Sequence, residues 1–126
     1  MREVTAIIRI NMMNKTKKAL SEAGIWSMTA GPALGRGKGI VDMELLKGVE
    51  RGYEEAIAQL GQSGRLIPKR ILFLVLPNNL VEKAVKTIIR VNRTGKSGDG
   101  TIYVTPVSDS VSVRTGESGD AVLDEG

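Results

Sequence analysis

The 126-residue sequence contains neither cysteine nor histidine, and these two absences remove several classes of function at once. Without cysteine the protein has no disulfides and no thiol nucleophile, and without histidine it has no imidazole general base. The usual zinc ligands are missing for the same reason. Any catalysis would have to depend on carboxylates, on lysine or on a ligand-bound metal.

Aromatic side chains and long hydrophobic runs are also scarce. Aromatic residues make up only 3% of the chain, which is poor for a surface that stacks on bases. The opening segment MREVTAIIRIN has no apolar run long enough for a signal peptide or a membrane span, so we expect a cytoplasmic protein. The net charge is +4, but acids and bases are interspersed. This pattern disfavours a polybasic nucleic-acid arm and leaves room for a local anion site.

The chain is long enough for one domain, which we assign to residues 1–126. Residues 3–10 are apolar and β-branched and predict a buried strand. Asn14 can cap a helix that ends at Gly24, and residues 25–34 are typical of a second strand. Together these segments form one β-α-β unit.

A second unit of similar size follows much later in the chain. Residues 70–76 predict a strand, and a helix begins at Asn78 or Asn79. Residues 101–107 and 110–114 predict two further strands before a polar tail at 115–126. Two such units predict an α+β fold of the ferredoxin-like split β-α-β type, with an antiparallel sheet.

The connector between the two units is longer than a compact fold needs. It covers residues 35–69, is rich in glycine and carries mixed charge. One interpretation is a disordered surface loop, and the other is a partner-binding arm that becomes ordered on contact.

Two glycine-rich loops could hold an anion. GRGKG at 35–39 and GKSGDG at 95–100 can each present backbone N–H groups to a phosphate, although neither has P-loop spacing. Each alone is a weak signal, since a tight turn explains it as well. As a pair at the ends of two β-α-β units, they could converge on one ligand.

These loops belong to a longer set of motifs that resembles the PII nitrogen-signalling proteins over nearly the whole chain. In order, the motifs are IIR at 7–9, EAGIWSMT at 22–29, GRGKG at 35–39, ELLKG at 44–48, TGKSGDGTIYV at 94–104 and VRTGE at 113–117. The long connector and its ending RLIPKR are most similar to the second of two PII paralogues encoded among nitrogenase genes in archaea and some anaerobic bacteria.

The resemblance implies a regulatory protein rather than an enzyme. PII proteins are trimers of ferredoxin-like subunits that bind ATP or ADP in clefts between subunits. Many bind 2-oxoglutarate with Mg-ATP, after which a long T-loop, here about residues 36–68, changes shape and partner. The nitrogenase-linked paralogues act together on dinitrogenase, so the resemblance implies either a homotrimer or an assembly with a sister paralogue. It implies no nucleic-acid partner.

The resemblance also assigns roles to individual residues, but it assigns no metal ligand. The implied nucleotide-binding residues are Ile7, Thr29, Gly35, Arg36, Gly37, Lys38, Gly39, Val75, Gly98, Asp99, Gly100, Thr101, Ser112 and Arg114. Ile7, Thr29 and Val75 would line the base and ribose side. The implied 2-oxoglutarate residues are Gly37, Lys38, Gly39 and Lys69. The implied partner-binding residues in the T-loop are Glu44, Lys47, Glu50, Arg51, Tyr53 and Glu54.

Three positions depart from the family pattern. Thr101 stands where the family usually has lysine, and Ser112 stands at the first arginine of its R-x-R pair. Gly39 replaces the glutamine that ligates Mg²⁺. Each lost charge-assisted contact costs about 1.5–3 kcal/mol. Arg36 occupies a position that is often aromatic and could compensate, so we expect nucleotide binding without tight discrimination for ATP.

Other functions remain open on the sequence alone. A PII trimer could instead regulate an ammonium transporter or an enzyme of nitrogen assimilation. An RNA-binding ferredoxin-like module would need exposed aromatics on its sheet, where the predicted strands at 5–10 and 71–76 offer only Phe73. A small phosphatase would need an anion loop near the first strand with a catalytic partner, and no convincing pair is visible.

Overall fold

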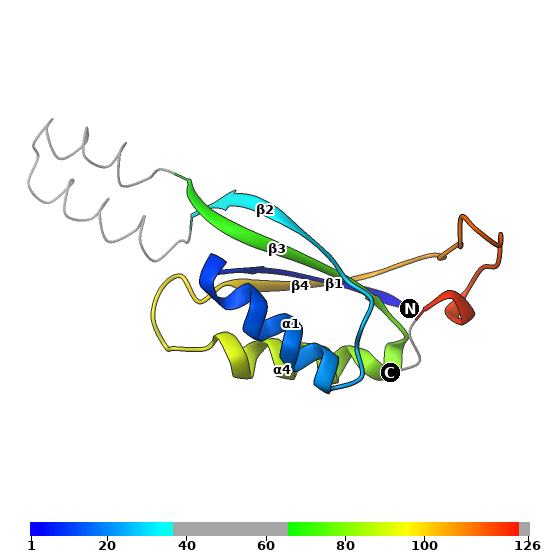
Figure 1. Cartoon of the computed structure of the whole chain (residues 1–126), viewed down its shortest axis with the longest axis horizontal. Helices are drawn as coiled ribbons and strands as arrows, with labels where there is room; N and C mark the ends of the chain where they lie inside the picture. Colours follow the sequence, from blue (N-terminus) through cyan, green and yellow to red (C-terminus); the bar gives the residue numbers. More distant parts are fainter. Residues whose placement is uncertain (37–65, 124–126) are drawn as a thin grey trace, which may run out of the picture.

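The computed structural model describes residues 1–36 and 66–123, which form a sheet covered on one face by two helices (Figure 1). The central strand β1 (Arg2–Ile8) pairs antiparallel with β3 (Ile67–Leu76) and with β4 (Thr101–Pro106). β2 (Thr29–Gly35) pairs antiparallel with β3, which gives the order β2-β3-β1-β4. This order and the antiparallel pairing confirm the ferredoxin-like split β-α-β prediction.

Alternation along the strands separates a core face from an open face. On β1 the side chains of Val4, Ala6 and Ile8 are buried, and on β3 those of Leu72, Leu74 and Leu76. They pack against α1 (Met13–Glu22) and α4 (Asn78–Asn92), which cover this face (Figure 1). The intervening odd-numbered side chains point to the opposite face of the sheet, because successive strand residues alternate. We call this uncovered side the open face.

The first helix begins differently from the sequence-based prediction. Asn14 lies inside α1 and caps nothing, because a 3-10 turn, η1 (Ile10–Met12), leads into the helix and makes Met12 its first boundary residue. No side chain caps either helix; at α4 the boundary residue is Pro77. The predicted cap at Asn14 is therefore wrong, while the predicted start of α4 at Asn78 is confirmed.

One predicted strand is shorter than expected, and another is absent. The strand predicted at 25–34 starts only at Thr29, because Ile25 is fully buried in the core instead of lying in the sheet. The strand predicted at 110–114 is absent: Val111 makes one isolated bridge with Ser118. The segment turns back on itself there, and the tail carries a short 3-10 turn, η2 (Asp120–Val122).

The outermost strands end the sheet at both sides. β2 is an edge strand and carries Pro32 at its middle, which has no amide hydrogen to offer a further strand. β4 is the other edge and ends at Pro106. Within residues 1–36 and 66–123, no helix has the length and apolar character needed to cross a membrane.

A buried polar bridge joins the two helices. Asn92, which is 4% exposed, donates through Nδ2 to Thr16 Oγ1 at 3.0 Å and to the Ile88 carbonyl at 2.9 Å. The Thr16 hydroxyl in turn donates to the Met12 carbonyl at 2.7 Å. The bridge therefore links the end of α4 to the start of α1.

We expect Thr16→Val to destabilise the protein by about 1–3 kcal/mol, because it removes an acceptor from a buried amide without changing side-chain shape much. Thr16→Ser keeps the hydroxyl and should cost less. Urea unfolding of both variants beside the wild type measures the difference. A valine variant as stable as wild type, with a weakened serine variant, would show that the methyl group matters and the bridge does not.

Candidate functional site

A cavity of about 170 Å³ opens beside the glycine loop that precedes β4, on the open face of the sheet. We call it the loop cavity. Its walls are formed by the end of β1, the end of β2, the start of β3, and the start of β4 with the loop that precedes it. The lining residues are Ile7, Gly35, Arg36, Lys69, Gly98, Gly100, Thr101 and Tyr103. All of these except Tyr103 were predicted ligand-binding residues.

The strand register explains this convergence. Ile7 on β1 lies opposite Thr101 on β4 and opposite Ile71 on β3. Lys69 precedes Ile71 by two residues and therefore shares its face, where it lies opposite Ala33 of β2. The predicted connector thus begins later and ends earlier than expected, because Gly35 belongs to β2, and Lys69 belongs to β3.

Two cations flank the backbone of Gly98. A side-chain carbon at that position would lie 3.3 Å from Arg9 Nη2 and 3.6 Å from Lys69 Nζ. Lys69 Nζ donates to the Gly98 carbonyl at 3.3 Å, and Arg9 Nη2 donates to the Ser97 carbonyl at 3.1 Å. The absence of a side chain at Gly98 keeps this space open. Arg9 is also ion-paired with Asp99, so Lys69 is the cation of this pair that suits an oxyanion approaching the loop.

Asp99 holds the loop in shape. Its carboxylate accepts from the Thr94 hydroxyl, from the Thr94 and Gly95 amides at 2.8 and 2.9 Å, and from Arg9 Nη1 at 2.8 Å. The Thr94 hydroxyl, then the Thr94 amide, and to a smaller extent Arg9 and Gly95 hold the pKa of Asp99 well below its usual range. These donors occupy the carboxylate, so its charge is compensated within the loop.

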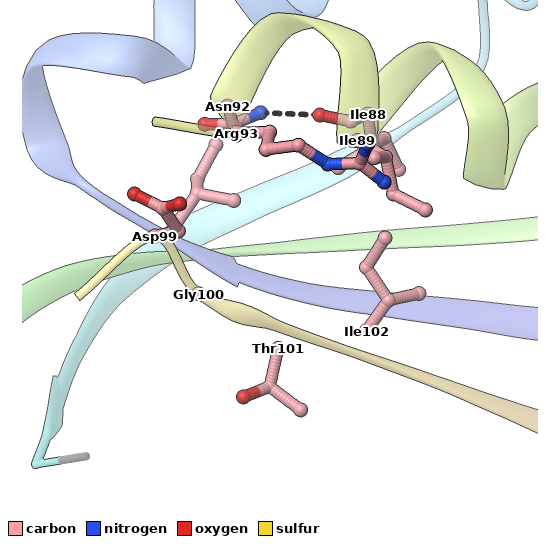
Figure 2. Close-up of a pocket in the computed structure, with 9 residues that line it drawn as sticks. Ile88, Ile89, Asn92, Arg93, Asp99, Gly100, Thr101 and Ile102 are labelled. Atoms are coloured by element: carbon pink, nitrogen blue, oxygen red, sulfur yellow. Dashed lines mark hydrogen bonds between the residues drawn. The ribbon is translucent and has the colours of Figure 1, made fainter. Parts of the chain in front are cut away.

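Asp99 lines a different cavity from Gly98. On the helix side of β4, a cavity of about 180 Å³ is lined by Asp99, Gly100, Thr101 and Ile102 together with the last turn of α4 (Figure 2). We call it the helix-side cavity. Asn92 contributes to its wall, and its Oδ1 atom has no hydrogen-bond partner within the described ranges. Gly100 and Thr101 line both this cavity and the loop cavity.

The predicted base-side residues do not lie together. Ile7 lines the loop cavity, whereas Thr29 and Val75 line a separate cavity of about 400 Å³. We call this one the strand-end cavity. Its other lining residues are Glu3, Ser27, Met28, Phe73, Val122 and Leu123. Lys69 and Val75 are six residues apart on β3, which corresponds to about 20 Å.

Ser112 and Arg114 line none of these three cavities. They follow β4, in the orange-to-red segment that projects from the end of the sheet opposite the yellow glycine loop (Figure 1). The Ser112 amide donates to the Glu117 carbonyl at 2.8 Å, and the Arg114 side chain is exposed. Several predicted residues lie outside the described ranges: Gly37, Lys38, Gly39, Glu44, Lys47, Glu50, Arg51, Tyr53 and Glu54.

Sequence reasoning missed Arg9 and Tyr103. Arg9 directly follows β1, and its contact with Asp99 spans ninety positions of sequence, so no local pattern points to it. Tyr103 could have been found, because it lies two residues after Thr101 on the same strand and must share its face. Its side chain is 55% exposed.

Comparison with known proteins gives consistent matches. The sequence model of the family described as "Nitrogen regulatory protein P-II" matches residues 1–117. The chain is 44% identical over 126 residues to the "Nitrogen fixation nifHD region GlnB-like protein 2" of Methanobacterium ivanovii, covering 98% of this chain and 100% of that protein. It is 34% identical over 123 residues to "Nitrogen regulatory protein P-II 1" of Escherichia coli, covering 98% and 100%.

The fold also matches a solved structure. Arabidopsis thaliana PII bound to citrate superimposes with a TM-score of 0.70 at 30% sequence identity. The match covers 95% of this chain and 89% of that one. The similarity therefore includes both the sheet and the helices.

The glycine loop offers a direct test of its geometry. A side chain at Gly100 would overlap the Ile7 carbonyl, and Gly100 has φ +119°, whereas Gly95 has φ +84° and open space around it. We expect Gly95→Ala to cost about 1–2 kcal/mol through backbone strain alone. Gly100→Ala should cost about 1–3 kcal/mol more, because the strand ends must also move apart. Equal unfolding free energies for the two variants in urea would contradict the close approach of β1 and the loop.

Proposed function

This chain belongs to the nitrogen regulatory protein P-II family, and from that membership we propose that it is a trimeric signal transduction protein. It senses adenine nucleotide, ATP or ADP, together with 2-oxoglutarate. It regulates nitrogen fixation by binding dinitrogenase through the T-loop of about residues 36–68. The whole chain, residues 1–126, forms a single domain, which includes the tail at 115–126 and assembles into the trimer.

The observation that carries the proposal is the convergence at the loop cavity. Two glycines far apart in the sequence, Gly35 at the end of β2 and Gly98 in the glycine loop, meet there beside the cation Lys69. Backbone approach combined with positive charge is the chemistry that recognises phosphate and carboxylate groups. The nucleotide phosphates would bind along Gly98 and Gly100, and a 2-oxoglutarate carboxylate would bind Lys69.

Assembly as a trimer would let residues of the two separate cavities bind the same nucleotide. The loop cavity is lined by the residues assigned to the phosphates, and the strand-end cavity is lined by Thr29 and Val75, which are assigned to the base and ribose. A nucleotide that spans a cleft between subunits can use the first cavity of one chain and the second of its neighbour. Ser112 and Arg114, which project beyond β4, would reach the phosphates of a neighbouring subunit in the same way.

The phosphate side is short of cations compared with the family pattern, because Thr101 and Ser112 stand at positions of positive charge. Arg36 and Lys69 line the loop cavity, whereas Arg9 lies beside Gly98 but is ion-paired with Asp99 at 2.8 Å. This balance favours binding of both ADP and ATP with modest discrimination between them. Mg²⁺ would depend on the ligands' own oxygen atoms, since Gly39 supplies no side-chain ligand.

The nitrogenase target is supported by the relatives. Relatives from Methanobacterium ivanovii, at 44% identity, and Methanosarcina barkeri, at 40%, carry names from the nitrogen-fixation nifHD and nifHD1 regions. The charged T-loop residues Glu44, Lys47, Glu50, Arg51 and Glu54, together with Tyr53, would form the contact. Coupling follows because the roots of this loop, Arg36 and Lys69, lie at the loop cavity.

Titration of the purified full-length chain with ADP, ATP and 2-oxoglutarate tests the sensing. We expect saturable nucleotide binding, with 2-oxoglutarate binding only when Mg-ATP is present. Lys69→Gln should weaken 2-oxoglutarate about tenfold or more, because a charge-assisted contact is lost. Lys15→Gln removes the same charge from the exposed surface of α1 and should change nothing. Wild-type protein that binds no nucleotide at millimolar concentration would refute the proposal.

Deletion of residues 46–64 tests the target. The shortened protein should still fold and bind nucleotide, because the described sheet and cavities exclude these residues. It should fail to inhibit dinitrogenase in an activity assay where the full-length chain inhibits. Normal inhibition by the shortened protein would show that the T-loop is only a linker, and inhibition of an ammonium transporter instead would reassign the target.

A further inference from the structure

The strand-end cavity has a composition that differs from the loop cavity. Its walls are largely apolar, with Met28, Phe73 and Val75 from the sheet side and Leu123 from the tail. At about 400 Å³ it is more than twice the volume of the loop cavity, and it falls within the usual range for small-molecule sites, about 300–1,000 Å³. It therefore suits an uncharged ring rather than a phosphate.

One ionisable group lines this apolar cavity. Glu3 lies on β1 directly opposite Val75 of β3, so its side chain points to the open face beside Val75. The residue is half-buried, and its carboxylate makes no hydrogen bond or ion pair within residues 1–36 and 66–123. A carboxylate can only accept hydrogen bonds, so a ligand that meets it must bring a donor.

The ring of Phe73 gives the strand-end cavity a surface on which a nucleobase can stack. Phe73 is two residues before Val75 on the same face, and it lies opposite Thr29. An aromatic face stacks on any nucleobase and does not distinguish one base from another. Selection among bases then falls to the polar groups at the edge of the cavity, and Glu3 is the one with a full charge.

We propose that Glu3 selects the base of the bound nucleotide, by accepting a hydrogen bond from the exocyclic amino group of adenine. This inference rests on the proposed function, because it assumes that a nucleotide base enters the strand-end cavity. A base with a carbonyl at the same position, such as hypoxanthine, would place two acceptors face to face. Sites built on a hydrogen bond reject analogues that lack the partner group.

The test compares ADP with inosine diphosphate, which differ at that exocyclic group, by titration calorimetry of the full-length protein. Wild type should bind ADP about tenfold or more tighter than inosine diphosphate. Glu3→Leu should weaken ADP by that factor and leave inosine diphosphate unchanged or slightly tighter, so that the preference disappears. Glu3→Gln keeps an acceptor oxygen and should retain part of the preference.

Glu22→Leu is the matched control, since it removes the same charge from an exposed position at the end of α1 and should keep the full preference. Retained binding of inosine diphosphate by Glu3→Leu also proves that the variant is folded. Equal wild-type affinities for the two nucleotides, or an unchanged preference in Glu3→Leu and Glu3→Gln, would overturn the inference and leave nucleotide sensing intact. Binding of neither nucleotide by wild type would refute the proposed function itself.

Discussion

The antiparallel pairing of β1 with two neighbours at once sets the position of nearly every residue considered above. β1 lies between β3 and β4, and its register with both is fixed over its length. A slip of one residue would move Val4, Ala6 and Ile8 out of the core and bring odd-numbered side chains into it. The hydrophobic cost of that exchange holds Ile7 at the loop cavity and Glu3 at the strand-end cavity. Packing on one face of the strand thus fixes chemistry on the other.

The glycine loop adds a local constraint of a different kind. An acidic residue in a candidate anion site is unexpected, because like charges repel. This repulsion is reduced because the Asp99 carboxylate accepts hydrogen bonds from Thr94 and Gly95 and forms an ion pair with Arg9. The same contacts keep the Gly98 backbone facing outward between two cations. The acidic residue therefore acts as an internal tie that orients the loop, while the glycines on either side of it leave the loop backbone without side chains.

Much of the fold was predictable because its signals are local. Apolar runs at 3–10 and 70–76 and helical spacing after Asn78 give the strands, the second helix and the split topology. The cap at Asn14 was wrong because a 3-10 turn intervened, a choice made by packing rather than by propensity. The strand at 110–114 failed because alternating valines alone do not provide a pairing partner.

The candidate site was only partly predictable for the same physical reason. Glycine-rich loops are visible in sequence, and Gly35 and Gly98 do meet at one cavity. Arg9 was invisible because its role depends on a partner ninety positions away. The separation of Thr29 and Val75 from Ile7 could not be read from motifs, because motif order along the chain does not say which strand end each residue occupies.

Pro32 in the edge strand β2 has a consequence for how the protein behaves when it is crowded. A free strand edge is a template for adding further chains, and it is the usual starting point of fibrous aggregates. The missing amide hydrogen at Pro32 interrupts the row of donors that such growth requires.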